Sequence, residues 1–353
     1  CIRDSLTAPS ESFWDSLGAS CLLFCSPAIC CERAYRQIMS SQQPSIDILL
    51  ATYQGGDHFT AQLDSLARQS YPAFNLIIRN DDCEECIAEK IEALSGHFAG
   101  QVTLLDDDCG QLGPLRSFSR LLEEARSDYM MLCDQDDVWL TTKVEKTLAM
   151  MLDMEQEYGQ NMPLLVHTDL TVVNNDLKVT SESLWQHQNI HPKNREVFNR
   201  LLVQNVVSGC TVMINKALRD IALPIPDQAV MHDWWLALVA SAFGKIGHVD
   251  QATLLYRQHN TNEIGAKEWG LPFILNNLLG NDGQLRDSIA RQQSQALAFI
   301  DFYQETLADD LRSVAECYAT IDQYPYVKKI CLLLQHRLFK AGLIRNIGLW
   351  AHI

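Results

Sequence analysis

The chain has 353 residues, 47% of them hydrophobic and 20% charged, which is typical of a globular protein with a substantial core. A formal net charge of −16 argues against general nucleic-acid binding, because that needs clustered Lys and Arg. No apolar run approaches the ~20 residues that span a bilayer as a helix. The cysteines beyond residue 31 are scattered, several within apolar runs, which favours reduced thiols in a cytoplasm.

The first 43 residues differ from the rest of the chain. They hold five of the twelve cysteines, and the first methionine, Met39, comes just before a polar linker. A short apolar stretch at 21–31 is interrupted by Pro27 and follows no basic cluster, so it makes a poor signal-peptide core. We interpret residues 1–43 as a leader of uncertain origin, disordered or non-native, and exclude it from the fold prediction.

From Ser45 onward, apolar runs of strand length alternate with segments of helical periodicity. The predicted strands cover 46–51, 74–78, 102–105 and 129–133. The predicted helices follow Asp57, cover about 87–98, and follow Pro114. Strands that alternate with helices predict an α/β fold, in which a mainly parallel, Rossmann-like sheet has helices on both faces.

The second half of the chain is more mixed. The expected strands cover 164–167, 210–214, 246–249 and 253–256, and a helix covers 233–243. From about residue 269 the sequence is helical and rich in loops. We therefore predict one α/β domain over 44–268 and a helical C-terminal region over 269–353.

Acidic residues follow two of the predicted parallel strands. Asp81 and Asp82 end the second strand, and Asp134, Asp136 and Asp137 end the fourth. Ligands bind beyond the carboxyl ends of such strands, and carboxylates that converge there are costly without a cation. An isolated Asp-x-Asp is more often a solvated turn, but two acidic strand ends favour a site for Mg²⁺ or Mn²⁺. Such a cation neutralises the diphosphate that leaves when a sugar is transferred from its nucleotide.

Several motifs in a fixed order resemble family 2 glycosyltransferases of the GT-A fold, and more closely bacterial rhamnosyltransferases. The resemblance covers about residues 45–265. The motifs are IDILLATYQGG (46–56), NDD (80–82), DQDDVW (134–139), HTDLTVV (167–173), NVVSGCT (205–211), MHDWW (231–235) and YRQHNTN (256–262). The chain departs from many relatives at Cys83-Glu84, where they have Gly-Ser, so the details of the base pocket are open.

The resemblance implies roles on the donor side of the site. Thr52 and Tyr53 would border the nucleotide, and either Asp81 or Asp82 would accept a hydrogen bond from the base. The ribose and the metal would be bound by three residues: Asp134 at the ribose, Asp136 as the main metal ligand, and His259 at the metal or the diphosphate.

On the acceptor side, the resemblance implies that Asp233 is the general base. The alternative is a plain helix N-cap. Trp234 and Trp235 could stack on the acceptor sugar or belong to the core. Asp169 could line the acceptor site or satisfy a loop backbone. Gly209 is expected at a tight turn where the backbone approaches the ligand.

Together these residues predict an inverting hexosyltransferase. The donor would be a nucleotide-diphosphate sugar, with L-rhamnose suggested by the resemblance and uridine-diphosphate hexoses open. The acceptor would be a hydroxyl of a cell-surface glycan or a lipid-linked saccharide. Two alternatives are a nucleotidyltransferase that makes the nucleotide sugar and a degenerate glycan- or nucleotide-binding module. The chain lacks the basic glycine-rich loop that the former usually needs.

The segment 326–353 carries five cations and no acid, and it is rich in Leu and Ile. A basic amphipathic segment can lie on the inner face of the cell membrane as a peripheral contact. An ordinary terminal helix packed on its own domain is the equal alternative.

Overall fold

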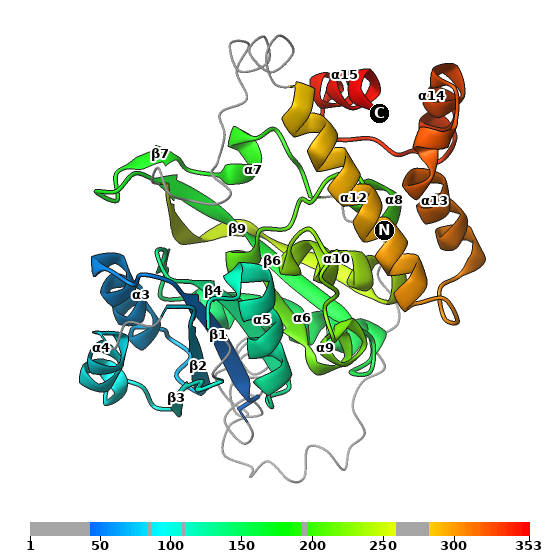
Figure 1. Ribbon diagram of the computed structural model, residues 1–353. Helices are drawn as coiled ribbons and strands as arrows, with labels where there is room; N and C mark the ends of the chain where they lie inside the picture. Colours follow the sequence, from blue (N-terminus) through cyan, green and yellow to red (C-terminus); the bar gives the residue numbers. More distant parts are fainter. Residues whose placement is uncertain (1–42, 83–85, 108–109, 193–196, 259–281) are drawn as a thin grey trace, which may run out of the picture. The chain divides into compact units, whose positions relative to one another are not determined.

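The computed structural model describes residues 43–82, 86–107, 110–192, 197–258 and 282–353. A single mixed sheet organises the α/β part (Figure 1). Its strands follow the order β3-β2-β1-β4-β8-β6-β9-β5, and β7 pairs with β6 alone. The strands are β1 (Ile46–Thr52), β2 (Phe74–Asn80), β3 (Val102–Leu104), β4 (Tyr129–Asp134), β5 (Val138–Trp139), β6 (Leu164–Val173), β7 (Val179–Ser181), β8 (Met213–Asn215) and β9 (Lys245–Arg257).

The first four predicted strands form the parallel half of this sheet. β1 lies between β2 and β4, and β3 lies at the edge beside β2. The short strand β8 then runs antiparallel to both β4 and β6, and β9 runs parallel to β6. The mainly parallel sheet that the sequence predicts is therefore confirmed.

Alternating apolar residues let each strand contribute to a core on either side of the sheet. In β1, Leu49 joins one core, whereas Ile48 and Leu50 join the other. The face of Ile48 is covered by α3 (Asp57–Ala67), α4 (Cys86–Ser95) and α6 (Lys143–Tyr158). The face of Leu49 is covered by α5 (Gly113–Glu124), α9 (Lys216–Ala222) and α10 (His232–Phe243) (Figure 1). Helices on both faces are thus also as predicted.

The C-terminal helices share the core of the second face. They are α12 (Asp282–Phe302), α13 (Asp309–Ala319), α14 (Tyr326–Gln335) and α15 (Leu343–His352). α12 crosses α10 in Figure 1, and the ring of Trp235 lies 5.4 Å from that of Phe299 between centroids. Residues 45–353 form one compact unit, and the predicted boundary at 268 falls outside the described residues. Within the described residues, every helix is too short or too polar to cross a membrane.

Four short elements complete the fold. They are α7 (Leu184–His187), α8 (Phe198–Leu201) and the 3₁₀ turns η1 (Gly209–Thr211) and η2 (Ile321–Gln323). η1 lies directly before β8 and contacts β4, so it sits where the fourth parallel strand ends. This position makes η1 part of the candidate site.

Candidate active site

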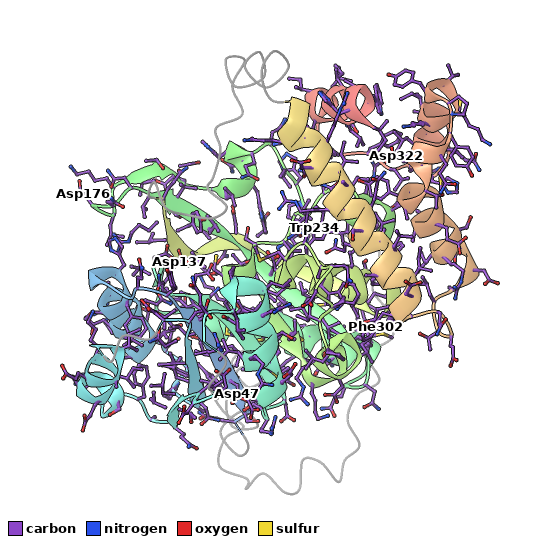
Figure 2. All side chains as sticks on the ribbon, viewed as in Figure 1. Asp47, Asp137, Asp176, Trp234, Phe302 and Asp322 are labelled. Atoms are coloured by element: carbon purple, nitrogen blue, oxygen red, sulfur yellow. The ribbon has the colours of Figure 1, made fainter. Side chains whose placement is uncertain are left out.

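Three parallel strands end side by side at one edge of the sheet. Thr52 at the end of β1 is in register with Asn80 of β2, and Ala51 is in register with Asp134 of β4. Figure 2 labels Asp137 at this edge, just beyond β4. The predicted donor-side residues of these three strands therefore lie next to one another, as the rule for parallel sheets requires.

Gln135 joins the loops that follow β1 and β4. Its side-chain oxygen Oε1 accepts hydrogen bonds from the Thr52 hydroxyl at 2.6 Å and from the Tyr53 backbone N–H at 2.9 Å. Its Nε2 donates to the Tyr53 carbonyl at 2.8 Å. The Thr52 hydroxyl is thus held by Gln135, whereas the Tyr53 side chain is 41% exposed and accessible to a ligand. No signal in the sequence pointed to Gln135, because a glutamine between acids is compatible with any loop.

The two acids that end β2 have different environments. Asp81 is buried, and its carboxylate is bound by Arg79 at 2.5 Å and by the backbone N–H groups of Leu112 and Gly113 at 2.6 and 2.7 Å. Asp82 is only half-buried. Asp81 therefore fixes the start of α5, and Asp82 is the more accessible of the two acids.

The acidic end of β4 forms a compact cluster with η1. Ligand atoms of Asp134, Asp137 and Cys210 all lie within 4.8 Å of one another. The Asp137 carboxylate is fully buried, and neither of its oxygens accepts a hydrogen bond of normal geometry. Burial, followed by the charges of Asp136 and Asp134, raises its pKa well above the ordinary range. The Cys210 thiol and the Arg257 backbone N–H lower the pKa of Asp137 by less, and the fully buried ammonium of Lys143 interacts with the same carboxylate.

These residues fit a divalent cation. A fully buried carboxylate beside two further carboxylates is the environment that a hard cation with oxygen ligands stabilises. The Cys210 thiol is a poor ligand for Mg²⁺ or Mn²⁺, and burial raises its pKa well above the ordinary value. Asp136, the predicted main ligand, is half-buried beside the cluster. The predicted ligand His259 lies outside the described residues.

Asp233 lies in the first turn of α10 and is buried. Its Oδ1 accepts a hydrogen bond from the Trp234 backbone N–H at 2.6 Å, and Gly209 N–H and the Asn205 side chain also donate to the carboxylate. Burial outweighs these hydrogen bonds and raises the pKa of Asp233 to about 7. The neighbouring His232 adds no compensating charge, because burial lowers its pKa to about 3.

The turn η1 brings the acidic cluster and Asp233 together. The backbone of Gly209 donates to Asp233, and the next residue, Cys210, contacts the cluster at Asp134 and Asp137. A Cβ at Gly209 would lie 3.2 Å from His232 Nε2 and 3.5 Å from Asp233 Oδ2. A side chain at this position would therefore be crowded by His232, and its absence lets the backbone lie close to His232 and Asp233.

Two of the residues predicted to contact the acceptor, Trp235 and Asp169, are buried. Trp235 is fully buried, donates from Nε1 to the Ala222 carbonyl and packs in the core, so it cannot contact an acceptor directly. Trp234 is half-buried and donates to the Leu201 carbonyl at 2.6 Å. Asp169 is buried, and its oxygens accept hydrogen bonds from the Ser183 hydroxyl and the Leu170 N–H. These hydrogen bonds favour the alternative in which Asp169 satisfies the hydrogen bonds of a loop and does not bind the acceptor.

Comparison with known proteins identifies the family. The sequence profile of "Glycosyl transferase family 2" matches residues 47–221, which include the strand ends and η1. The chain belongs to this family. The chain is 22% identical to a Bacillus subtilis (strain 168) protein named as a teichuronic acid biosynthesis glycosyltransferase, TuaG, over 65% of this chain and 85% of TuaG. It is also 22% identical to the dTDP-rhamnosyl transferase RfbG of Shigella flexneri, over 62% of this chain and 74% of RfbG.

The fold of this glycosyltransferase also matches solved structures. The mannosyltransferase PcManGT from Pyrobaculum calidifontis, solved with GDP-Man and Mn²⁺, superposes with a TM-score of 0.51 and 12% identity. The match covers 92% of this chain and 86% of PcManGT. The predicted GT-A architecture is therefore confirmed.

Proposed function

We propose that this glycosyltransferase transfers a hexose from a nucleotide-diphosphate sugar to a glycan hydroxyl with inversion at the anomeric carbon. The observation that carries the proposal is Asp233, a buried carboxylate with a pKa of about 7 that lies one short turn from the acidic end of β4. L-Rhamnose is our first candidate for the sugar, supported by the similarity to RfbG and by the motifs. The similarity to TuaG supports an acceptor in a cell-surface polysaccharide or its lipid-linked precursor.

The reaction is a single displacement. The acceptor hydroxyl oxygen forms a bond to the anomeric carbon as the bond from that carbon to the diphosphate breaks, and the hydroxyl proton passes to Asp233. A base with a pKa near the working pH combines a large deprotonated fraction with useful proton affinity. Asp233 also holds the acceptor oxygen in line, so positioning contributes as well as proton transfer. No protein nucleophile takes part.

The donor would be held at the strand ends. Asp82 would accept a hydrogen bond from the nucleobase, and the exposed ring of Tyr53 would border the nucleoside. Asp134 would bind the ribose. Asp136 and Asp137 would hold a divalent cation, Mg²⁺ or Mn²⁺, which neutralises the charge of a leaving diphosphate when bound. Asp81 and Gln135 keep these groups in place without contacting the donor.

We also propose a cytoplasmic location. The described cysteines Cys133, Cys210, Cys317 and Cys331 are all free thiols, which suits a reducing compartment. A cytoplasmic enzyme would meet its nucleotide sugar directly.

The donor assignment is tested by thermal unfolding with a panel of nucleotide sugars, each with Mn²⁺, Mg²⁺ or EDTA. A ligand that binds only the native state stabilises it by about 2.7 kcal/mol at a hundredfold excess over its dissociation constant. We expect a metal-dependent shift with one deoxythymidine- or uridine-diphosphate sugar. A folded protein that responds to no donor would instead be the degenerate binding module.

The base assignment is tested with Asp233→Asn. The amide keeps the size of the side chain but cannot accept the proton, so we expect normal donor binding and loss of transfer. Asp220→Asn, which changes an exposed acid on α9, is the matched control and should leave turnover unchanged. NMR of the product checks the anomeric configuration. Normal turnover by Asp233→Asn, or a product with retained configuration, would refute the mechanism.

A further inference from the structure

Helix α15 buries two polar residues together with Leu349 and leaves three large apolar residues exposed. Arg345 and Asn346 are buried, and the Arg345 guanidinium donates to the carbonyls of Ala341 and Gln188 at 3.0 and 2.6 Å. In contrast, Leu343 is 69% exposed, and Ile344 and Ile347 are each 43% exposed. A helix on a protein surface normally buries its apolar face. The side of α15 that carries Leu343, Ile344 and Ile347 is therefore a candidate contact for an apolar partner.

Helix α14 has a similar exposed stripe. Val327 and Leu334 are 74% and 50% exposed, and the exposed Cys331 lies between them at helical spacing. The opposite side of the helix holds the fully buried Leu333 in the core. Seven residues separate α14 from α15, and both helices lie beyond α12 in the upper right of Figure 1.

Exposed apolar side chains are concentrated in this part of the chain. The described residues contain fifteen exposed large hydrophobic side chains, and six of them lie in α14 and α15. Single exposed apolar residues are normal on any surface, whereas a concentration of them marks an interaction site. The six residues are Tyr326, Val327, Leu334, Leu343, Ile344 and Ile347.

The segment that carries these side chains contains basic residues and no acidic residue. All 44 acidic residues of the chain precede Tyr326, although the protein as a whole has a net charge of −16. Lys328 and Arg337 are exposed. Lys329 pairs with Asp322 at 3.1 Å, and Lys340 is held inward, where burial lowers its pKa to about 8. Fewer of the five cations in this segment are therefore exposed than the sequence suggested. A partner of this surface would be bound mainly through apolar contacts.

We propose that the exposed faces of α14 and α15 dock on a bilayer that contains anionic lipids. We call these six apolar side chains, with Lys328 and Arg337, the docking face. A bilayer offers both an apolar interior and a negative surface, and these two features match the docking face. A second copy of the chain, placed face to face, would bring like charges together. The proposal is independent of the transfer reaction and goes beyond it.

Co-sedimentation of the full chain with sucrose-loaded vesicles tests the proposal. We expect binding to vesicles of phosphatidylcholine with phosphatidylglycerol, and weaker binding to phosphatidylcholine alone. The double variant Ile344→Gln with Ile347→Gln should reduce the partition coefficient about tenfold, because two side chains stay in water. Lys328→Gln with Arg337→Gln, which removes two charges, should reduce binding about thirtyfold on the anionic vesicles only.

Matched controls carry the same chemical change elsewhere. Leu104 on β3 and Val179 on β7 are 39% and 50% exposed, so Leu104→Gln with Val179→Gln should bind vesicles like the wild type. All variants should keep the donor-dependent thermal shift, which separates a failure of docking from a failure of the proposed function. Absence of wild-type binding to anionic vesicles would overturn the proposal. So would a wild-type dimer, seen by light scattering, that Ile344→Gln with Ile347→Gln converts to a monomer.

Discussion

The buried carboxylate of Asp233 should make the protein less stable as the pH rises. Its pKa is about 7 in the folded protein, compared with an ordinary value of 3.8 in an unfolded chain. Between these two values the folded state holds a proton that the unfolded state releases. Stability therefore decreases with increasing pH over this range, because the unfolded state binds fewer protons. Asp233→Asn removes the titrating group, and this part of the pH dependence should disappear.

The size of the effect follows from the two pKa values. One pKa unit corresponds to about 1.36 kcal/mol, so Asp233 alone should remove about 2.5 kcal/mol of unfolding free energy between about pH 5 and about pH 8. The amide also changes the hydrogen bonds to Gly209 and Asn205, which shifts the absolute stability of the variant. The comparison therefore uses the change of stability with pH in each protein, not its absolute value. The constant shift then cancels, and the remaining difference is the contribution of the Asp233 carboxyl group.

Urea unfolding of wild type and Asp233→Asn across this pH range, without metal or donor, provides the measurement. All other titrating groups are common to both proteins and cancel in the comparison. The same pKa predicts that kcat/KM of the wild type falls about tenfold for each pH unit below about 7. Parallel stability profiles for the two proteins would show that Asp233 titrates normally, and the argument for a tuned base would fail.

Three further predictions concern the donor side. Asp136→Ala should abolish metal-dependent donor binding in the thermal assay, whereas Asp176→Ala, an exposed acid near β7, should not. Gln135→Glu cannot donate to the Tyr53 carbonyl, so it should raise the donor KM about tenfold with a smaller effect on kcat. Arg79→Met removes the cation beside the buried Asp81 carboxylate and should cost about 3 kcal/mol by urea unfolding, against less than about 1 for the exposed Arg116→Met.

The sequence was sufficient to predict the parallel half of the sheet and the place of the acids. Apolar runs such as that of β1 allow only a buried strand, and acids that follow parallel strands must meet at one edge. Thr52, Asp82 and Asp134 therefore lie where the pattern predicts. The antiparallel strand β8 was expected only as a strand, because its pairing with β4 and β6 depends on contacts distant in sequence.

Side-chain environments at the site could not be predicted in the same way. Asp81 and Asp82 are adjacent and chemically identical, yet the backbone N–H groups of Leu112 and Gly113 at the start of α5 donate to Asp81. Trp234 and Trp235 are likewise equivalent in a helical pattern until α12 covers one of them. In each pair, a partner from another element decides which residue stays accessible. Spacing along the chain holds no information about that partner.

The raised pKa of Asp233 has a similar tertiary origin. A first-turn aspartate of an exposed helix would have a lowered pKa, because the helix dipole and the free N–H groups stabilise its charge. Here α10 starts within the protein, and η1 and the neutral ring of His232 take the place of water around the carboxyl group. The loss of solvation exceeds the gain from four hydrogen bonds. The same burial that should destabilise the fold above pH 7 is therefore what would let an aspartate act as a base near neutral pH.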